Sequence, residues 1–163
     1  SYKTPEWPLT MPKHAEIRRL PFSQQQMFDL VADVARYPEF LPWCVATRIR
    51  RQTPTEMVAD MAIGFKSFRE SFTSQVALNT PDSIDVMYKD GPFKYLINHW
   101  KLTKTPDGCE VDFQVNFEFR SRVLEKAIGL VFEQAVHRMV SAFEARALDL
   151  YGDSAAQKKT GYS

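Results

Sequence analysis

The chain has 163 residues, of which 44% are hydrophobic and 25% charged, and its formal net charge is +1. This composition excludes a disordered chain and predicts one soluble globular domain with a substantial core. The longest apolar run, residues 127–132, is far shorter than the ~20 residues of a membrane-spanning helix. Two widely separated cysteines, Cys44 and Cys109, indicate neither a disulfide framework nor a structural zinc site, as expected in a reducing compartment.

The predicted domain spans residues 13–151. Residues 1–12 contain three prolines, without the basic and apolar regions of a secretory signal, and we expect them to form a flexible lead-in. Residues 152–163 are small and polar and are expected to form a flexible tail. Residues 14–20 predict the first strand.

A first helix is predicted to begin after Ser23, because Ser23 and Gln26 have the spacing of a capping box and the following apolar residues share one face. The motif YPEFLPWC, residues 37–44, comes next. Its two prolines disfavour helical geometry at the residues before them. The motif therefore predicts a sharp corner with at most a short second helical turn, and its aromatic side chains must pack on another part of the fold.

Apolar residues then alternate with period two over residues 46–119, and turn signals divide this region into strands of an antiparallel meander. The clearest strand is residues 111–120, where Val111, Phe113, Val115, Phe117 and Phe119 alternate with polar residues such as Asn116 that are expected to face water. With residues 14–20, about seven strands are expected.

Ser121 is predicted to cap a final helix over residues 122–150. Its expected apolar stripe comprises Leu124, Ile128, Val131, Phe132, Ala135, Val136, Met139, Phe143 and Leu150. The opposite face, which carries Lys126, Glu133, His137, Ser141 and Glu144, is expected to face solvent. The predicted fold class is α+β: a curved antiparallel sheet around a long C-terminal helix, with two short helices after the first strand.

Such a sheet either fills its concave face with side chains or leaves a cavity for an apolar ligand, and the sequence leaves both open. Strand alternation places Glu70 on the face of Phe72, and Asn98 on that of Trp100, whereas His99 faces the other way. Buried polar groups need partners. Glu70 and Asn98 therefore contact either the polar head of a ligand or structural partners, an arginine for Glu70 and backbone groups for Asn98.

The remaining polar residues predict no catalytic or metal site, since His14, His99 and His137 lie on three different elements without metal-ligand spacing. If the first two strands are neighbours, five basic residues gather into a patch: Arg18, Arg19, Arg48, Arg50 and Arg51. Such a patch suits an RNA backbone or an anionic membrane, or it is an ordinary solvated face.

Four segments resemble the coenzyme Q-binding proteins of the START-like, polyketide-cyclase-like helix-grip superfamily. They are MFDLVADVARYPEFLPWC (27–44), GFKSFRESFTSQV (64–76), GPFKYLINHWKL (91–102) and VDFQVNFEFRSRVLE (111–125). The resemblance implies a deep apolar cavity that binds ubiquinone or a related polyprenyl lipid, without catalysis and with no metal or redox cofactor. It also implies chaperoning of the quinone at the membrane for respiratory electron transport or quinone biosynthesis.

The same family includes ribosome-association toxins, described as blocking subunit joining, so a ribosome-binding regulator is the alternative and an aromatase or cyclase a further one. The expected partners are the polyprenyl quinone, a transient membrane surface and proteins of quinone biosynthesis or respiration, with the ribosome as alternative. The expected location is the bacterial cytoplasm with peripheral inner-membrane contact, or the matrix side of the mitochondrial inner membrane.

On this resemblance, with strand and helix faces taken into account, a pocket of ~300–1,000 Å³ is expected. The expected ligand-binding residues are Phe40, Trp43, Met61, Phe65, Glu70, Phe72, Tyr88, Leu96, Asn98, Trp100, Phe113, Val115, Phe117, Val131, Phe132, Ala135 and Met139. Leu130 is expected to be exposed and to contact a membrane. It lies beside Gly129, which we expect at the centre of the wet face.

Overall fold

The computed structural model describes the backbone of residues 13–160 and the side chains of residues 13–152. The predicted lead-in and residues 161–163 of the predicted tail lie outside the described residues. The elements are β1 (His14–Leu20), α1 (Gln24–Ala32), the 3-10 helix η1 (Val34–Glu39), β2 (Cys44–Gln52), β3 (Glu56–Phe65), β4 (Phe68–Asn79), β5 (Ser83–Asp90), β6 (Phe93–Thr105), β7 (Gly108–Phe119), α2 (Arg122–His137) and α3 (Met139–Thr160).

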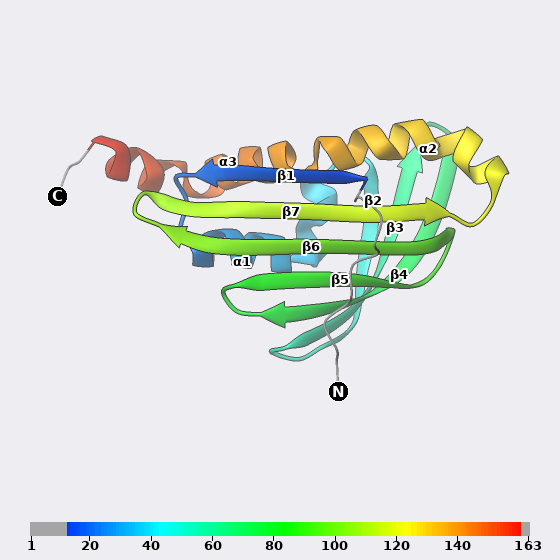
Figure 1. Cartoon of the computed structure of the whole chain (residues 1–163), viewed down its shortest axis with the longest axis horizontal. Coiled ribbons are helices and arrows are strands. Elements are labelled where there is room, and N and C mark those ends of the chain that lie inside the picture. Colours follow the sequence, from blue (N-terminus) through cyan, green and yellow to red (C-terminus); the bar gives the residue numbers. More distant parts are fainter. Residues whose placement is uncertain (1–12, 161–163) are drawn as a thin grey trace.

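The strands form one antiparallel sheet in the order β1-β7-β6-β5-β4-β3-β2. Neighbours from β2 to β7 are consecutive in the chain, whereas β1 pairs with the last strand, with His14 opposite Val115 and Leu20 opposite Cys109. Figure 1 shows β2, β3 and β4 crossing the direction of β6 and β7 steeply, so the sheet curves, and α2 and α3 run along it. The predicted α+β fold is confirmed.

The sheet order corrects the predicted basic patch. β1 and β2 are the two opposite edges of the sheet rather than neighbours, so Arg18 and Arg48 lie on strands that are not paired. Arg18 instead faces α3, where its guanidinium donates hydrogen bonds to the Glu144 carboxylate at 2.7 Å and to the Ser141 hydroxyl at 3.1 Å. The helix face that was predicted to be solvated is therefore partly covered by β1.

The first helix begins where the sequence predicted. The Gln26 N–H donates to the Ser23 hydroxyl at 3.0 Å, and the Gln26 side-chain oxygen accepts the Ser23 N–H at 2.9 Å, which completes the capping box. The corner that begins in η1 packs inward, with the rings of Tyr37 and Phe40 edge-on to Phe143 of α3 at 5.3 and 5.1 Å between centroids. The aromatics of YPEFLPWC thus close one end of the core.

The C-terminal helix differs from the prediction in being two segments. Helix α2 ends at His137, and the Arg138 N–H is shared between the carbonyls of Gln134 and Ala135, each at 3.2 Å. No proline or glycine marks this break, so the sequence predicted one continuous helix. The backbone of α3 continues to Thr160 instead of ending near residue 150, in agreement with the alanine, glutamine and lysine content of residues 155–159.

Several predicted faces also change. Leu130 is 71% exposed, as predicted, but Gly129 is buried, because this side of α2 turns toward Phe119 of β7. Val131 and Leu150, predicted to belong to the apolar stripe, are exposed. Leu150 lies beyond the break, across which a single helical phase does not extend, whereas Val131 lies within α2 beside the exposed Leu130. On β7, Asn116 is only 2% exposed although it was predicted to face water.

Candidate functional site

A small cavity, here called the inner cavity, lies between the concave face of the sheet and the helices, with a volume of about 90 Å³. Its wall includes residues of α1, η1, β3 to β7, α2 and α3. The predicted ligand-binding residues that line it are Trp43, Met61, Phe72, Leu96, Asn98, Trp100, Phe113, Val115, Phe132 and Met139. Much of the concave face is therefore filled, and the cavity is smaller than expected.

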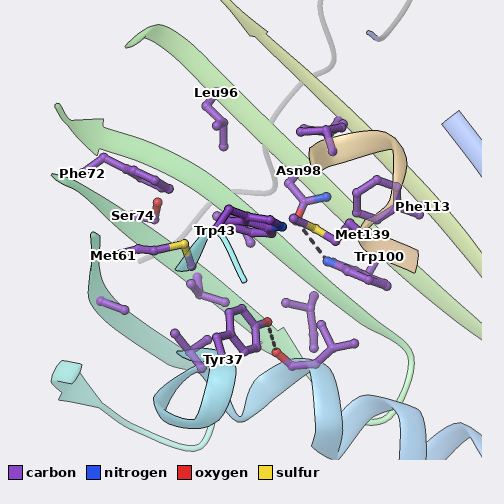
Figure 2. Close-up of a pocket in the computed structure, with 18 of the residues that line it drawn as sticks. Tyr37, Trp43, Met61, Phe72, Ser74, Leu96, Asn98, Trp100, Phe113 and Met139 are labelled. Atoms are coloured by element: carbon purple, nitrogen blue, oxygen red, sulfur yellow. Dashed lines mark hydrogen bonds between the residues drawn. The ribbon is translucent and has the colours of Figure 1, made fainter. Parts of the chain in front are cut away.

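Polar atoms in this wall are few, and most have partners (Figure 2). The Tyr37 hydroxyl donates to the carbonyl of Val31, and burial raises the pKa of Tyr37 far above its ordinary value, so the phenol stays neutral. The Asn98 amide donates to the Gln114 carbonyl at 3.0 Å, and its oxygen accepts the Trp100 indole N–H at 3.0 Å. Of the two alternatives for Asn98, a ligand head group or backbone partners, the structure shows a backbone partner, Gln114, together with the Trp100 side chain.

A second and larger space, here called the outer groove, has a volume of about 680 Å³. It lies between the YPEFLPWC corner, the turn joining β3 to β4, and α2 with the start of α3. The predicted residues Phe40, Phe65, Val131 and Ala135 line this groove instead of the inner cavity. Trp43 lines both spaces, so its indole stands between the groove and the cavity.

The structure places Tyr88, Phe117 and Glu70 outside both walls. Tyr88 and Phe117 pack with Phe93, at 5.6 and 6.1 Å between ring centroids, in an aromatic cluster that fills the concave face at this end of the sheet. Glu70 is half-buried opposite Ile63, close to the turn between β3 and β4 and beyond the cavity. No ion pair links Glu70 to a basic side chain within residues 13–152, so the predicted arginine partner is also not observed.

Sequence reasoning missed several lining residues, which are Val31, Val34, Tyr37, Ala59, Ser74, Val76, Ile84, Val86 and Val136. Most of them could have been found. Ser74 and Val76 share the face of Phe72 by strand alternation, and Ile84 and Val86 share one face of β5. His99 was placed correctly on the opposite face from Trp100, where its ring nitrogen hydrogen-bonds the Asp85 carboxylate.

The two cysteines are buried and unpaired with each other, and burial raises the pKa of Cys44 and of Cys109 to about 11. Such thiols stay protonated near neutral pH and are poor nucleophiles. Within the described residues, no three His, Cys, Asp or Glu side chains gather as a metal site would require. Over the same residues, no helix is long and apolar enough to cross a membrane.

Comparison with known sequences gives a family match and several relatives. Residues 20–144 match the family described as polyketide cyclase / dehydrase and lipid transport. The chain is 38% identical over 144 residues to the ribosome association toxin RatA of Escherichia coli (strain K12), covering 88% of this chain and 91% of that protein. It is 32% identical over 145 residues to the coenzyme Q-binding protein COQ10 homolog B, mitochondrial, of Xenopus laevis, covering 86% of this chain and 59% of that protein.

Solved structures agree with the fold. The 18 kDa protein CC1736 from Caulobacter crescentus is 34% identical, with a TM-score of 0.67 over 85% of this chain and 97% of that one. The Zhui aromatase/cyclase from Streptomyces sp. R1128 has a TM-score of 0.70 at 13% identity, over 82% of this chain and 90% of that one. At that identity the second likeness shows a shared fold alone.

Proposed function

Because this chain belongs to the polyketide cyclase / dehydrase and lipid transport family, we propose that it binds a polyprenyl quinone such as ubiquinone in the inner cavity and outer groove. It holds the quinone at a membrane surface for respiratory electron transport or quinone biosynthesis. The observation that carries this proposal is the pair of spaces that meet at Trp43, with a wall dominated by apolar side chains.

The sizes of the two spaces decide how a lipid is accommodated. Typical ligand pockets have volumes of ~300–1,000 Å³, so the outer groove, at about 680 Å³, lies within this range and the inner cavity, at about 90 Å³, lies below it. A quinone therefore occupies both spaces and widens the inner one. The break between α2 and α3 at Arg138 gives α2, which borders both spaces, a place to move.

The wall of the inner cavity supports binding rather than catalysis. Among the described residues that line it there is no His, Cys, Asp, Glu or Lys that could act as a general base, and the hydroxyl groups of Tyr37 and Ser74 have no such base beside them in the wall. The relative from Xenopus laevis carries the name of a coenzyme Q-binding protein, which supports a quinone as the ligand. We therefore propose a non-catalytic protein for which the quinone is a bound ligand and no cofactor is needed.

The energetics favour action at a membrane. A polyprenyl tail is already in an apolar environment in the bilayer and gains little on moving into a protein cavity, because the hydrophobic effect acts on surface removed from water. The net affinity is therefore modest, and a long tail extends beyond the groove. A modest affinity and a protruding tail support peripheral contact with the inner membrane of a bacterium, or with the mitochondrial inner membrane, rather than transport of the quinone through water.

The test is mass spectrometry of the organic-solvent extract of the purified protein. We expect a co-purified polyprenyl quinone, and much less of it in the extract of Val86→Phe, which places a larger side chain in the wall of the inner cavity. An extract without quinone, or an equal amount from both proteins, would contradict the proposal.

A second candidate, ribosome binding, is favoured by the 38% identity to RatA over 91% of that protein. It does not require the inner cavity. Sedimentation of the protein with ribosomal subunits through a sucrose gradient tests it, and Val86→Phe should then sediment like the parent. Absence from every ribosomal fraction would rule this candidate out.

A further inference from the structure

Ser74 is a polar side chain of the inner cavity whose buried hydroxyl has no hydrogen-bond partner among the described residues. It lies on β4 between Phe72 and Val76 on the concave face, opposite Ala59 of β3 and Tyr88 of β5. The residue is 6% exposed, its hydroxyl oxygen has almost no contact with solvent, and no described atom hydrogen-bonds with it. Figure 2 shows Ser74 among the side chains that line the cavity.

An unpartnered hydroxyl is unfavourable in an apolar wall, because it has lost its hydrogen bonds to water without replacing them. The polar groups of Tyr37, Asn98 and Trp100 in the same wall have partners, since Tyr37 donates to a carbonyl and Asn98 bridges Gln114 and Trp100. Ser74, in the wall of the inner cavity, is therefore left with an unused hydrogen-bond donor, which is available to a ligand that widens the cavity.

We propose that Ser74 donates a hydrogen bond to an uncharged acceptor oxygen, a carbonyl or an ether, on the polar end of the ligand. That end enters the inner cavity first, and the apolar remainder passes Trp43 into the outer groove. This deepens the proposed lipid-binding function and rests on it.

Two features of the site set the chemical class and the orientation of the ligand. No ionisable group except the neutral Tyr37 phenol lines the inner cavity within the described residues, so a charged end group would lie there without a counter-ion. Basic side chains, Lys66 and Arg138, lie instead along the outer groove. The inner volume of about 90 Å³ suits a compact end group better than a long polyprenyl chain.

The experiment compares two probes on three proteins. The probes are a decyl-substituted benzoquinone, which has carbonyl oxygens, and decylbenzene, which has none. The proteins are the parent, Ser74→Ala and Val76→Ala, where Val76 is the next residue on the same face of β4 and also lines the cavity. Affinities come from displacement of a bound fluorescent apolar dye, and melting temperatures are measured without probe.

We expect Ser74→Ala to weaken benzoquinone binding by about 3- to 10-fold, the value of one hydrogen bond, and to leave decylbenzene binding unchanged. Its melting temperature without probe should stay the same or rise, because an unpartnered hydroxyl has been removed. Val76→Ala should weaken both probes equally, since it removes only apolar contact.

The outcomes separate this inference from the proposed function. If both probes bind the parent and Ser74→Ala changes both or neither, the role of Ser74 is wrong and lipid binding stands. A Ser74→Ala protein that melts earlier without any change between probes would indicate a structural hydroxyl satisfied by water. If neither probe binds the parent, the lipid-binding function and the inference both fail.

Discussion

Val86→Phe should make the unliganded protein more stable while blocking ligand binding. Val86 lies on β5, in the middle of the sheet, opposite Val76 of β4 and Asn98 of β6, and lines the inner cavity. A phenylalanine at this position directs its ring into unfilled space. Aromatic residues also suit a strand position.

The size of the effect follows from the cavity volume. An internal cavity destabilises a protein by about 24 cal/mol per Å³, so filling all of a cavity of about 90 Å³ would raise the free energy of unfolding by about 2 kcal/mol. For a domain of this length that is about 4–8 °C in melting temperature. Partial filling gives a smaller rise of the same sign.

The control is Val111→Phe, the same substitution on β7 at a residue that is 0% exposed and does not line the cavity. Overpacking a filled position lowers the free energy of unfolding by about 1–3 kcal/mol. Thermal melts followed by circular dichroism, with and without decyl-benzoquinone, measure both variants. If Val86→Phe loses as much stability as Val111→Phe, the cavity is not present in solution. If Val86→Phe gains stability but still binds the quinone, the ligand binds outside the inner cavity.

Phe117→Asp should prevent folding, because the Phe117 ring is 3% exposed and its centroid lies 4.9 Å from that of Phe132. Glu118→Ala, at the exposed neighbouring position, should melt like the parent. Equal melting of the two variants would show that the assigned strand faces are wrong. Leu130→Glu should leave the melting temperature unchanged and slow quinone exchange between protein and liposomes, and unimpaired exchange would argue against membrane contact by α2. The free energy of unfolding should fall as the pH rises from the ordinary pKa of a thiol toward 11. In this pH range the unfolded state releases the Cys109 proton, whereas the folded state, in which burial raises the pKa of Cys109 to about 11, keeps it. Chemical denaturation of Cys109→Ala should show a shallower fall over the same range, and an identical pH profile would contradict the raised pKa.

The features that could be predicted from the sequence depend on residues close together in the chain. The capping box of Ser23 and Gln26 requires only a spacing of three, and the alternation of β7 requires only a period of two. The prolines of YPEFLPWC likewise act on their immediate neighbours. The family resemblance, which was carried by four such segments, was also confirmed by the match over residues 20–144.

The features that could not be predicted depend on contacts between distant elements. The pairing of β1 with β7 decides which strands form the edges of the sheet. The sequence does not show this pairing, so the predicted neighbours of Arg18 were wrong. Glu70 lies on the predicted face of β4, but too near the turn between β3 and β4 to reach the cavity. The alternation of side chains predicts the face of a residue but not its distance from the cavity along the strand. The volume of the inner cavity depends on how side chains from nine helices and strands pack together, and the periodicity of a single segment cannot predict it.

The pairing of β1 with β7 has a consequence for synthesis of the protein. The first strand leaves the ribosome early, but its hydrogen-bonding partner is the last strand, and α2 and α3 follow later still. Contacts between such distant parts of a chain form slowly, and until α2 and α3 are made the apolar concave face is covered only by α1 and η1. We therefore expect the nascent chain to depend on chaperones until α2 and α3 have been synthesised, and truncation before α2 to yield an aggregating product.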